Sequence, residues 1–202
     1  MTKNRLGWAL TATVVAATIA IPAVLRPDNG DHARVVVRTS APVVARAVTN
    51  PARSCETSDS PANWYARRYG ISPCLAHTIW REARASGVDP GIVFGLIAHE
   101  SRFDPHAIGR EGERGLMQIK PATARAYERD VTAEALMRPE TNLRLGLLHL
   151  KREVEHFGHD WTLGLLAYHM GRGRLTRALE RGRVPGTEYA TRVLSHLRER
   201  PL

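Results

Sequence analysis

Residues 89–101 read DPGIVFGLIAHES, a stretch that predicts a helix with one acidic residue on its apolar face. Asp89 is a favoured residue for capping the start of a helix, and Pro90 is tolerated at the first helical position. Helix positions three, four and seven residues apart lie on the same face. In this stretch that face consists of Val93, Leu96, Ile97 and Glu100. A charged residue is therefore predicted where apolar side chains pack.

Glu100 has two interpretations from the helix pattern alone. Apolar surroundings favour the protonated form of a carboxyl group, which is the form that a general acid must hold before it donates a proton. A structural role is also open, in which Glu100 pairs with Arg102 or Arg114, or turns to solvent at a bend before Asp104. Structural ion pairs are common enough that the pattern does not choose between the two.

Further helices are predicted on both sides of this stretch. Ser72 and Pro73 begin one helix and Gly87 ends it, since these residue types favour helix starts and stops. Three more are predicted: one from about Pro139 to Gly158, one that Asp160 caps and that Gly171 and Gly173 end, and one after Pro185 and Gly186. No alternating run is long enough for a sizeable sheet. The predicted fold class is therefore mainly α, in a single globular domain over residues 61–202.

The N-terminal residues predict export. Lys3 and Arg5 precede an uncharged, largely apolar run over residues 6–25. This order is typical of a signal peptide, and the run also has the roughly 20 residues that a membrane anchor needs. Residues 1–25 are therefore a signal peptide or a signal anchor, with a buried core helix as the alternative. Residues 26–60 are rich in Pro, Ala, Val, Arg and Ser and predict a flexible tether.

The two cysteines, Cys55 and Cys74, lie near the junction of the tether and the folded domain. In an exported protein the oxidising surroundings favour a disulfide between them, which would attach the end of the tether to the first helix. Two unpaired buried thiols are the alternative. Two cysteines are too few for a disulfide-dense scaffold.

The net charge does not identify a function. The 202 residues contain 29 Lys and Arg against 20 Asp and Glu, a formal net charge of +9. An anionic partner such as nucleic acid, lipid head groups or an acidic polymer is one interpretation. The other is a compositional preference for arginine spread over the surface, because only three of the basic residues are lysines.

Several short motifs in a fixed order carry more information than the charge. They are HESRFDPHA at 99–107, GERGLMQIKPATA at 112–124, Asn142 with Gly146, AYHMG at 167–171, and Tyr189 with Val193. This ordered set resembles the catalytic domain of the soluble lytic transglycosylases, lysozyme-like enzymes that cleave the glycan strands of peptidoglycan. The resemblance extends from about Pro61 to Ser195.

The resemblance implies a peptidoglycan lytic transglycosylase with Glu100 as its catalytic acid and base. It also implies substrate-binding roles, or positions close to the substrate, for Ser101, Gly115, Leu116, Met117, Gln118, Asn142, Tyr168, His169 and Tyr189. The implied partner is the glycan strand of peptidoglycan, and no cofactor is implied. The implied location is the periplasm or the cell-wall side of the inner membrane, with residues 6–25 as a candidate anchor. Because an exported protein does not meet nucleic acid, nucleic acid is no longer the favoured anionic partner.

Two positions depart from the family pattern. The family usually has asparagine where this chain has His169, which puts the hydrogen bonding around Tyr168 in question. It usually has a small residue where this chain has Glu113, which raises the question of a second carboxylate near the site.

The family reaction explains how one carboxyl group can be enough. Glycosidases that use water commonly need two carboxylates. A lytic transglycosylase instead directs the 6-hydroxyl of N-acetylmuramic acid to the anomeric carbon of the same sugar, so that the product is a 1,6-anhydro end. Two alternatives stay open: a muramidase of the same fold that uses water with help from Glu113 or Asp104, and a non-catalytic glycan-binding or scaffolding subunit.

Two remaining groups of residues have weaker interpretations. The nine histidines form no recognised ligand motif with Cys or Asp, so no metal site is predicted. The densest basic stretch is a solvated helix face or a contact for acidic peptidoglycan stems, phosphate-bearing wall polymers or membrane. It consists of Arg172, Arg174, Arg177, Arg181 and Arg183.

Overall fold

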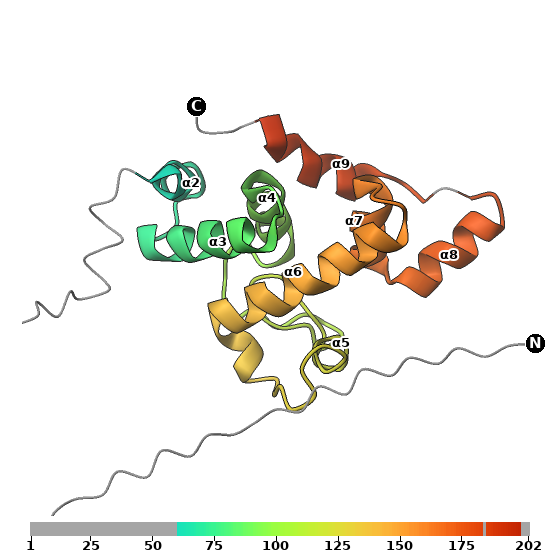
Figure 1. The fold of residues 1–202 in the computed structure, drawn as a ribbon, viewed down its shortest axis with the longest axis horizontal. Helices are drawn as coiled ribbons and strands as arrows, with labels where there is room; N and C mark the ends of the chain where they lie inside the picture. The colour runs from blue at the N-terminus through green and yellow to red at the C-terminus, as the bar shows by residue number, and fades with distance from the viewer. Residues whose placement is uncertain (1–59, 184, 199–202) are drawn as a thin grey trace, which may run out of the picture. The chain divides into compact units, whose positions relative to one another are not determined.

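The chain folds into helices joined by short turns and one longer loop (Figure 1). The computed structural model describes residues 60–183 and 185–198. Its elements are α2 (Pro61–Tyr69), α3 (Pro73–Ser86), α4 (Pro90–Glu100), α5 (Pro121–Ala124), η1 (Ala135–Met137), α6 (Pro139–His156), α7 (Trp161–Met170), α8 (Arg172–Glu180), α9 (Glu188–Ser195) and η2 (His196–Arg198). Within these ranges the only strand-like pairing is two isolated bridges, Ile108 with Arg114 and Arg114 with Ile119. The predicted mainly α class is confirmed.

Three of the predicted helix starts are confirmed by side-chain caps. The Ser72 hydroxyl accepts a hydrogen bond from the Leu75 N–H at 3.2 Å at the start of α3. The carboxylates of Asp89 and Asp160 do the same for the backbone at the starts of α4 and α7, at 2.8 and 2.9 Å. Each cap satisfies an N–H group that has no partner inside its helix, which is why these helices begin where they do.

Of the two glycines predicted to end the helix after Asp160, Gly171 is confirmed and Gly173 was wrong. Helix α7 ends at Met170, and Gly171, with a φ of 88°, separates it from α8. Gly173 was expected to interrupt the chain but lies in the first turn of α8. Buried Leu175 and half-buried Leu179, four residues apart, give this segment an apolar side that packs on the domain and outweighs the glycine.

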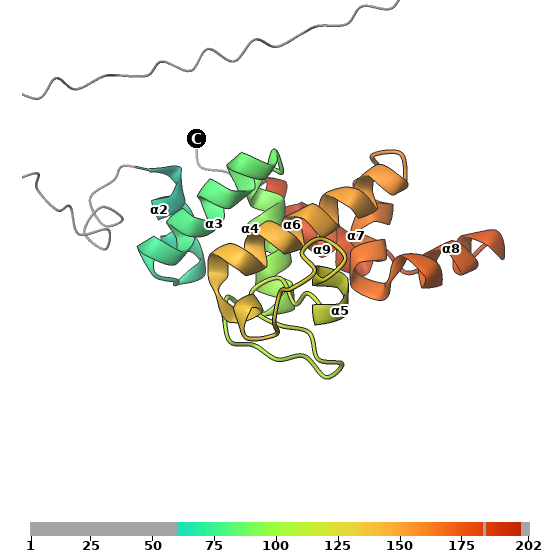
Figure 2. The same ribbon diagram turned by 60° about the horizontal axis from the view of Figure 1, so that its bottom comes forward.

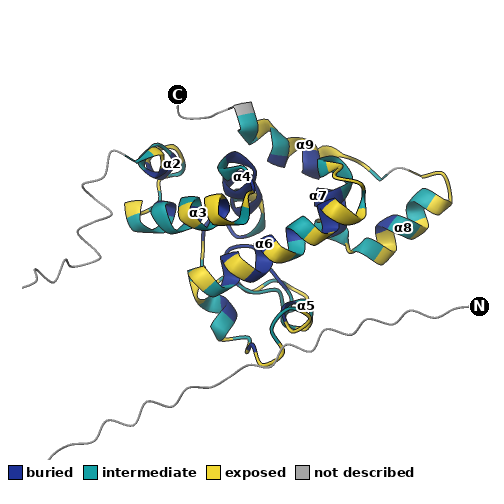
Figure 3. Cartoon of the chain, in the orientation of Figure 1, coloured by how far each residue is buried: buried dark blue, intermediate teal, exposed yellow. Residues whose placement is uncertain are grey.

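Helix α4 lies at the centre of the hydrophobic core (Figures 2 and 3). Its residues 91–97 are all buried, so it is apolar on nearly every side rather than on one stripe. At Gly95 a Cβ atom would lie 2.6 Å from the His196 ring and 2.8 Å from the Val193 carbonyl oxygen, which shows how closely α9 and η2 approach. Because α4 leaves the core only at its last turn, Glu100 is placed where the core meets solvent.

The predicted leader, all of the tether except Ser60, and Cys55 lie outside the described residues. Ser60 caps α2. Between residues 60 and 198, as far as they are described, no helix combines the length and the apolar character that crossing a membrane requires. The signal peptide, the anchor and the Cys55–Cys74 disulfide therefore stay predictions; Cys74 itself is half-buried in the first turn of α3.

Candidate functional site

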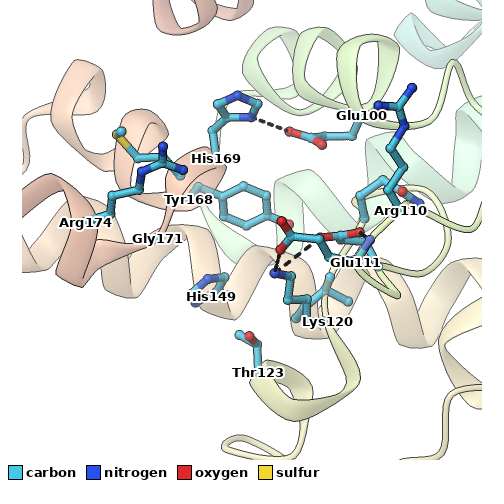
Figure 4. A pocket seen from close by; sticks show the side chains of 14 residues that line it. Glu100, Arg110, Glu111, Lys120, Thr123, His149, Tyr168, His169, Gly171 and Arg174 are labelled. Carbon is cyan, nitrogen blue, oxygen red and sulfur yellow. Dashed lines mark hydrogen bonds and ion pairs between the residues drawn. The ribbon is translucent and has the colours of Figure 1, made fainter. Parts of the chain in front are cut away.

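Glu100 lies on the wall of a groove with a volume of about 440 Å³ (Figure 4). One side of the groove is formed by the loop before α5, and the other by the end of α7 and the start of α8. The lining residues are Glu100, Arg110, Glu111, Glu113, Gln118, Ile119, Lys120, Thr123, His149, Tyr168, His169, Met170, Gly171 and Arg174. Elements far apart in the sequence therefore converge on the predicted acid.

The carboxyl group of Glu100 is held by residues from α7 and α9. Its side chain is 16% exposed, and its Oε1 accepts a hydrogen bond from the Tyr189 hydroxyl at 2.5 Å. His169 Nδ1 lies 3.9 Å from the same oxygen, and its ring stacks on Tyr189 with centroids 4.1 Å apart. No Lys or Arg of the described chain lies within 4 Å of the Glu100 oxygens, which excludes the alternative role in which Glu100 pairs with Arg102 or Arg114.

Tyr189 keeps its proton throughout the physiological range. Burial, followed by the charge of Glu100 and the hydrogen bond to it, raises the pKa of Tyr189 well above 10.0. The hydroxyl therefore donates to Glu100 and stabilises the carboxylate when that form is present. Oε1 is committed to this bond, and the described residues provide no hydrogen bond to Oε2, which leaves Oε2 to exchange a proton with a ligand.

Tyr168 connects α7 to the loop that forms the opposite side of the groove. Its hydroxyl donates to the Met117 carbonyl oxygen at 2.8 Å. Burial, followed by the charge of Glu100 and the influence of Tyr127, raises the pKa of Tyr168 well above 10.0. Tyr168 thus acts as a permanent donor that fixes the position of the loop relative to Glu100.

The loop itself is held from below by Asn142 of α6, whose side chain is fully buried. Its Oδ1 accepts from the Met117 N–H at 2.7 Å, and its Nδ2 donates to the carbonyls of Arg114 and Leu136 at 2.7 and 2.8 Å. Gly115 lies directly above, with a φ of 70° and with room for no Cβ, since that atom would be 2.4 Å from Asn142 Nδ2. The loop backbone therefore rests on one amide side chain.

The structure separates the predicted site residues into two groups. Glu100, Gln118, Tyr168 and His169 line the groove, and Tyr189 stands directly behind Glu100. The side chains of Leu116 and Met117 are completely buried and, with Gly115, Ser101 and Asn142, are not among the groove-lining residues.

The side chains of Gln118 and Ser101 both donate hydrogen bonds to backbone carbonyl groups. Gln118 has a φ of 48°, uncommon for a residue with a side chain, and its Nε2 donates to the carbonyls of Ala107 and Gly115 at 3.2 and 2.9 Å. These bonds hold a strained position that turns the chain along the groove. Ser101 ends α4, and its hydroxyl donates to the Ile97 carbonyl at 3.4 Å.

The other two carboxylates that line the groove, those of Glu111 and Glu113, are paired with a lysine. Lys120 contacts Glu111 and lies 3.4 Å from Glu113. Burial raises the pKa of Glu113. Hydrogen bonds from backbone N–H groups and the contact with Lys120 outweigh burial, so that the pKa of Glu113 lies below its ordinary value. Asp104 is exposed, accepts from the His106 N–H and does not line the groove. Glu113 is therefore held as a carboxylate, a poor proton donor at neutral pH.

A polar cluster under the groove floor was missed by sequence reasoning. Glu153, with a 3% exposed side chain, binds Arg172 through two hydrogen bonds of 2.9 and 2.7 Å. His149 Nδ1 lies 3.4 Å from Glu153 and 3.1 Å from the Tyr127 hydroxyl. The four-residue spacing of His149 and Glu153 on α6 was the available signal, whereas Arg172 comes from another helix.

This cluster makes stability depend on pH. Burial lowers the pKa of His149 below 6.5, and the charges of Arg172 and Arg152 add to this against the opposing charge of Glu153. Below pH 6.5 the unfolded chain therefore binds a proton on His149 that the folded chain does not. Neutral His149 therefore makes its full contribution to stability above pH 6.5. This contribution is lost as the pH falls towards the lowered pKa that His149 has in the folded state.

We expect His149→Gln to weaken this pH dependence while keeping a polar partner for Tyr127. The measurement is the free energy of unfolding by urea at about pH 7.5 and about pH 5.5. His106→Gln, at an exposed histidine outside the cluster, is the control and should leave the wild-type difference unchanged. An unchanged difference in His149→Gln would contradict the assignment.

Metal binding has no structural support within residues 60–183 and 185–198, where no three His, Cys, Asp or Glu side chains are grouped closely enough to hold an ion. The sequence-based expectation that no metal is used stays a prediction.

The chain resembles known proteins both in sequence and in structure. The family model of the transglycosylase SLT domain matches residues 77–190, more than half of the chain. The chain is 33% identical over 91 residues to membrane-bound lytic murein transglycosylase D from Escherichia coli (strain K12), across 43% of this chain and 20% of that protein. It is 29% identical over 109 residues to the transglycosylase of Enterobacteria phage PRD1, across 54% of this chain and 39% of the phage protein. The chain thus spans less than half the length of these curated relatives.

Among solved structures, the chain is similar to the 70-kDa soluble lytic transglycosylase from Escherichia coli. The TM-score is 0.53 at 24% sequence identity, with 59% of this chain and 23% of that chain covered. This likeness shows the fold alone, and it confirms the fold that the sequence motifs implied.

Proposed function

The chain belongs to the transglycosylase SLT family, and from this premise we propose that it is a peptidoglycan lytic transglycosylase. It cleaves the β-1,4 bond between N-acetylmuramic acid and N-acetylglucosamine and leaves a 1,6-anhydro end on the former. Relatives named as lytic murein transglycosylases support the substrate class.

The observation that carries this proposal is the isolation of Glu100 from the other charged groups of the groove. Glu111 and Glu113 both contact Lys120, whereas the neighbours of Glu100 are a tyrosine hydroxyl and an imidazole. Among the carboxyl groups that line the groove, Glu100 is therefore the one that contacts neither a lysine nor an arginine. A mechanism with one acid/base group fits this arrangement better than a mechanism with two free carboxylates.

The proposed reaction has two proton transfers, both at Glu100. Protonated Glu100 gives its proton to the glycosidic oxygen as the bond from that oxygen to the anomeric carbon breaks. The resulting carboxylate, stabilised by the Tyr189 hydroxyl, then takes the proton of the 6-hydroxyl while that oxygen bonds to the anomeric carbon of the same sugar. Because the attack is intramolecular, holding the sugar in the right conformation replaces much of what a positioned water and a second base would provide.

Mass spectrometry of digested sacculi tests the proposal directly. Anhydro ends are the expected product. Reducing ends, which are heavier by one water, would instead identify a muramidase. Binding of glycan without any release over the whole pH range would identify a non-catalytic glycan-binding subunit.

Tyr189→Phe tests the support that Glu100 receives from α9. The variant removes the 2.5 Å hydrogen bond to Glu100 but keeps a ring for His169 to stack on. A hydrogen bond to a charged group contributes roughly 1.5–3 kcal/mol, so we expect kcat to fall by about tenfold or more, with little change in KM.

Tyr69→Phe is the matched control for this prediction, because it removes a tyrosine hydroxyl that bonds His196 at 2.9 Å outside the groove. Its kcat should stay close to wild type. An equal loss in the two variants would show that the Tyr189 effect is only structural.

The proposed place of action is outside the cytoplasm, on the cell-wall side of the inner membrane. This part of the proposal depends on the basic flank and apolar run of residues 1–25, interpreted as a signal peptide or anchor.

A further inference from the structure

Helix α8 carries a row of exposed arginines that begins in the groove. The helix packs on α7 and buries Leu175, and Figure 1 shows it extending away from the side of the domain that α2 and α3 occupy. Arg172, in its first turn, is tied to buried Glu153. The direction of α8 is therefore fixed by the core, while its outer face is left to solvent.

Three arginines share this outer face. Arg174 and Arg177 lie in α8 and Arg181 is the residue directly after its end. Their spacing of three and four residues places all three on one side of the helix over a length of about 10 Å. All three are exposed. Arg174 is also a lining residue of the groove (Figure 4). The row therefore continues the groove outward rather than forming a separate patch.

These three guanidinium groups, like that of Arg110 on the groove wall, differ from two other cations near the groove. Lys120 and Arg172 both contact glutamates. In the part of the chain that the structure describes, by contrast, no carboxylate lies within 4 Å of Arg174, Arg177 or Arg181. Like charges on successive turns repel each other, and a row of this kind attracts an anionic partner most strongly where it borders a binding groove.

The chemistry of the substrate identifies the anion. The sugars of a peptidoglycan glycan are uncharged along the strand, and the carboxylates belong to the short peptides attached to alternate sugars. A guanidinium binds a carboxylate through two parallel hydrogen bonds, which suits such groups better than it suits sugar hydroxyls. We propose that Arg174, Arg177 and Arg181 bind the carboxylates of these peptides, so that peptide-bearing strands are preferred over bare glycan. The inference rests on the proposed function of the groove.

The test compares two forms of one substrate: intact sacculi, and the soluble strands that remain after an amidase has removed the peptides. Because that hydrolysis leaves a lactyl carboxylate on each N-acetylmuramic acid, the stripped strands are still anionic, and what they lack is the carboxylates of the peptides. The variant Arg177→Gln/Arg181→Gln changes the two arginines that do not line the groove. Arg84→Gln/Arg129→Gln, which removes two exposed arginines elsewhere, is the matched control. All are made in the full chain. kcat/KM is measured on both substrates, and binding is measured by co-sedimentation with sacculi and by sedimentation velocity with the soluble stripped strands.

We expect the α8 variant to lose about fivefold in kcat/KM and in affinity for intact sacculi, because two exposed ion pairs together strengthen binding by about that factor. Cleavage and binding of stripped strands should be unchanged, and the control variant should match wild type on both substrates. Equal losses on both substrates, no loss on intact sacculi, or the same loss in the control would each overturn the proposal.

Two further outcomes separate this proposal from its alternatives. If the wild-type protein cleaves neither substrate, the proposed function fails, and sedimentation alone then decides whether α8 favours peptide-bearing strands. If the variant loses binding only to vesicles containing phosphatidylglycerol and keeps its preference for intact sacculi, α8 binds a lipid surface and the proposal is wrong.

Discussion

Glu100→Gln is expected to reduce turnover by a factor of about 10³ to 10⁴, the upper part of the range that a general acid and base contributes. Glutamine has the shape of glutamate and can still accept a hydrogen bond from Tyr189, which now bonds Glu100 Oε1 at 2.5 Å. It cannot release a proton to the leaving oxygen. The fold and the groove should therefore persist while the chemical step is lost.

The measurement separates these effects by comparing kcat with binding. Released fragments from sacculi give kcat, and sedimentation with sacculi gives affinity, which should stay within about threefold of wild type because the lost interaction belongs to the transition state. Glu155→Gln changes an exposed glutamate on α6 and should leave turnover unchanged. If turnover in Glu100→Gln remains within about tenfold of wild type, Glu100 is not the acid.

Asn142→Leu is expected to destabilise the protein by about 4 kcal/mol. Leucine fills nearly the same volume but leaves the Met117 N–H and the carbonyls of Arg114 and Leu136 without their partner. Each buried group that loses its hydrogen bond costs about 1–3 kcal/mol, and the losses of groups that share one partner do not simply add. The expected observation is a lower midpoint of urea unfolding at an unchanged slope.

Thr141→Leu is the control for this prediction, since it introduces the same side chain at the adjacent, half-buried position of α6. It should cost less than about 1 kcal/mol, because no buried backbone group loses a partner. Asn142→Leu should also lower turnover at temperatures where it is folded, because Tyr168 is bonded to the Met117 carbonyl. A variant as stable as the control would show that the loop does not depend on this amide.

The limits of most helices could be predicted because their causes are local. Ser72, Asp89 and Asp160 satisfy backbone N–H groups within three residues of themselves. Gly87 and Gly171 end helices with positive φ angles that few other residues adopt. Gly173 was misjudged because its helix depends on Leu175 packing against the core, which is not a local property.

The candidate site was predicted only in part. The helix pattern placed Glu100 on an apolar face, and the motif resemblance added most of the residues around it. The resemblance assigned Leu116 and Met117 to substrate binding, but their side chains turn into the core, as the residue pattern taken alone favoured. Neither signal indicated that Lys120 contacts Glu111 and Glu113. The Glu153–Arg172 pair under the groove was not anticipated, because its two residues lie on different helices.

The sequence by itself determined the helical class, the starts of α3, α4 and α7, and the position of one carboxyl group at the end of a buried helix. Capping, proline and glycine geometry, and the spacing of apolar residues act over a few positions, so they can be recognised along the chain. Only the tertiary structure decided which groups surround that carboxyl. The Tyr189 hydroxyl reaches Glu100 across 89 residues, and Asn142 reaches Met117 across 25. These contacts depend on how α4, α6, α7 and α9 pack, and packing brings together residues that no local pattern relates.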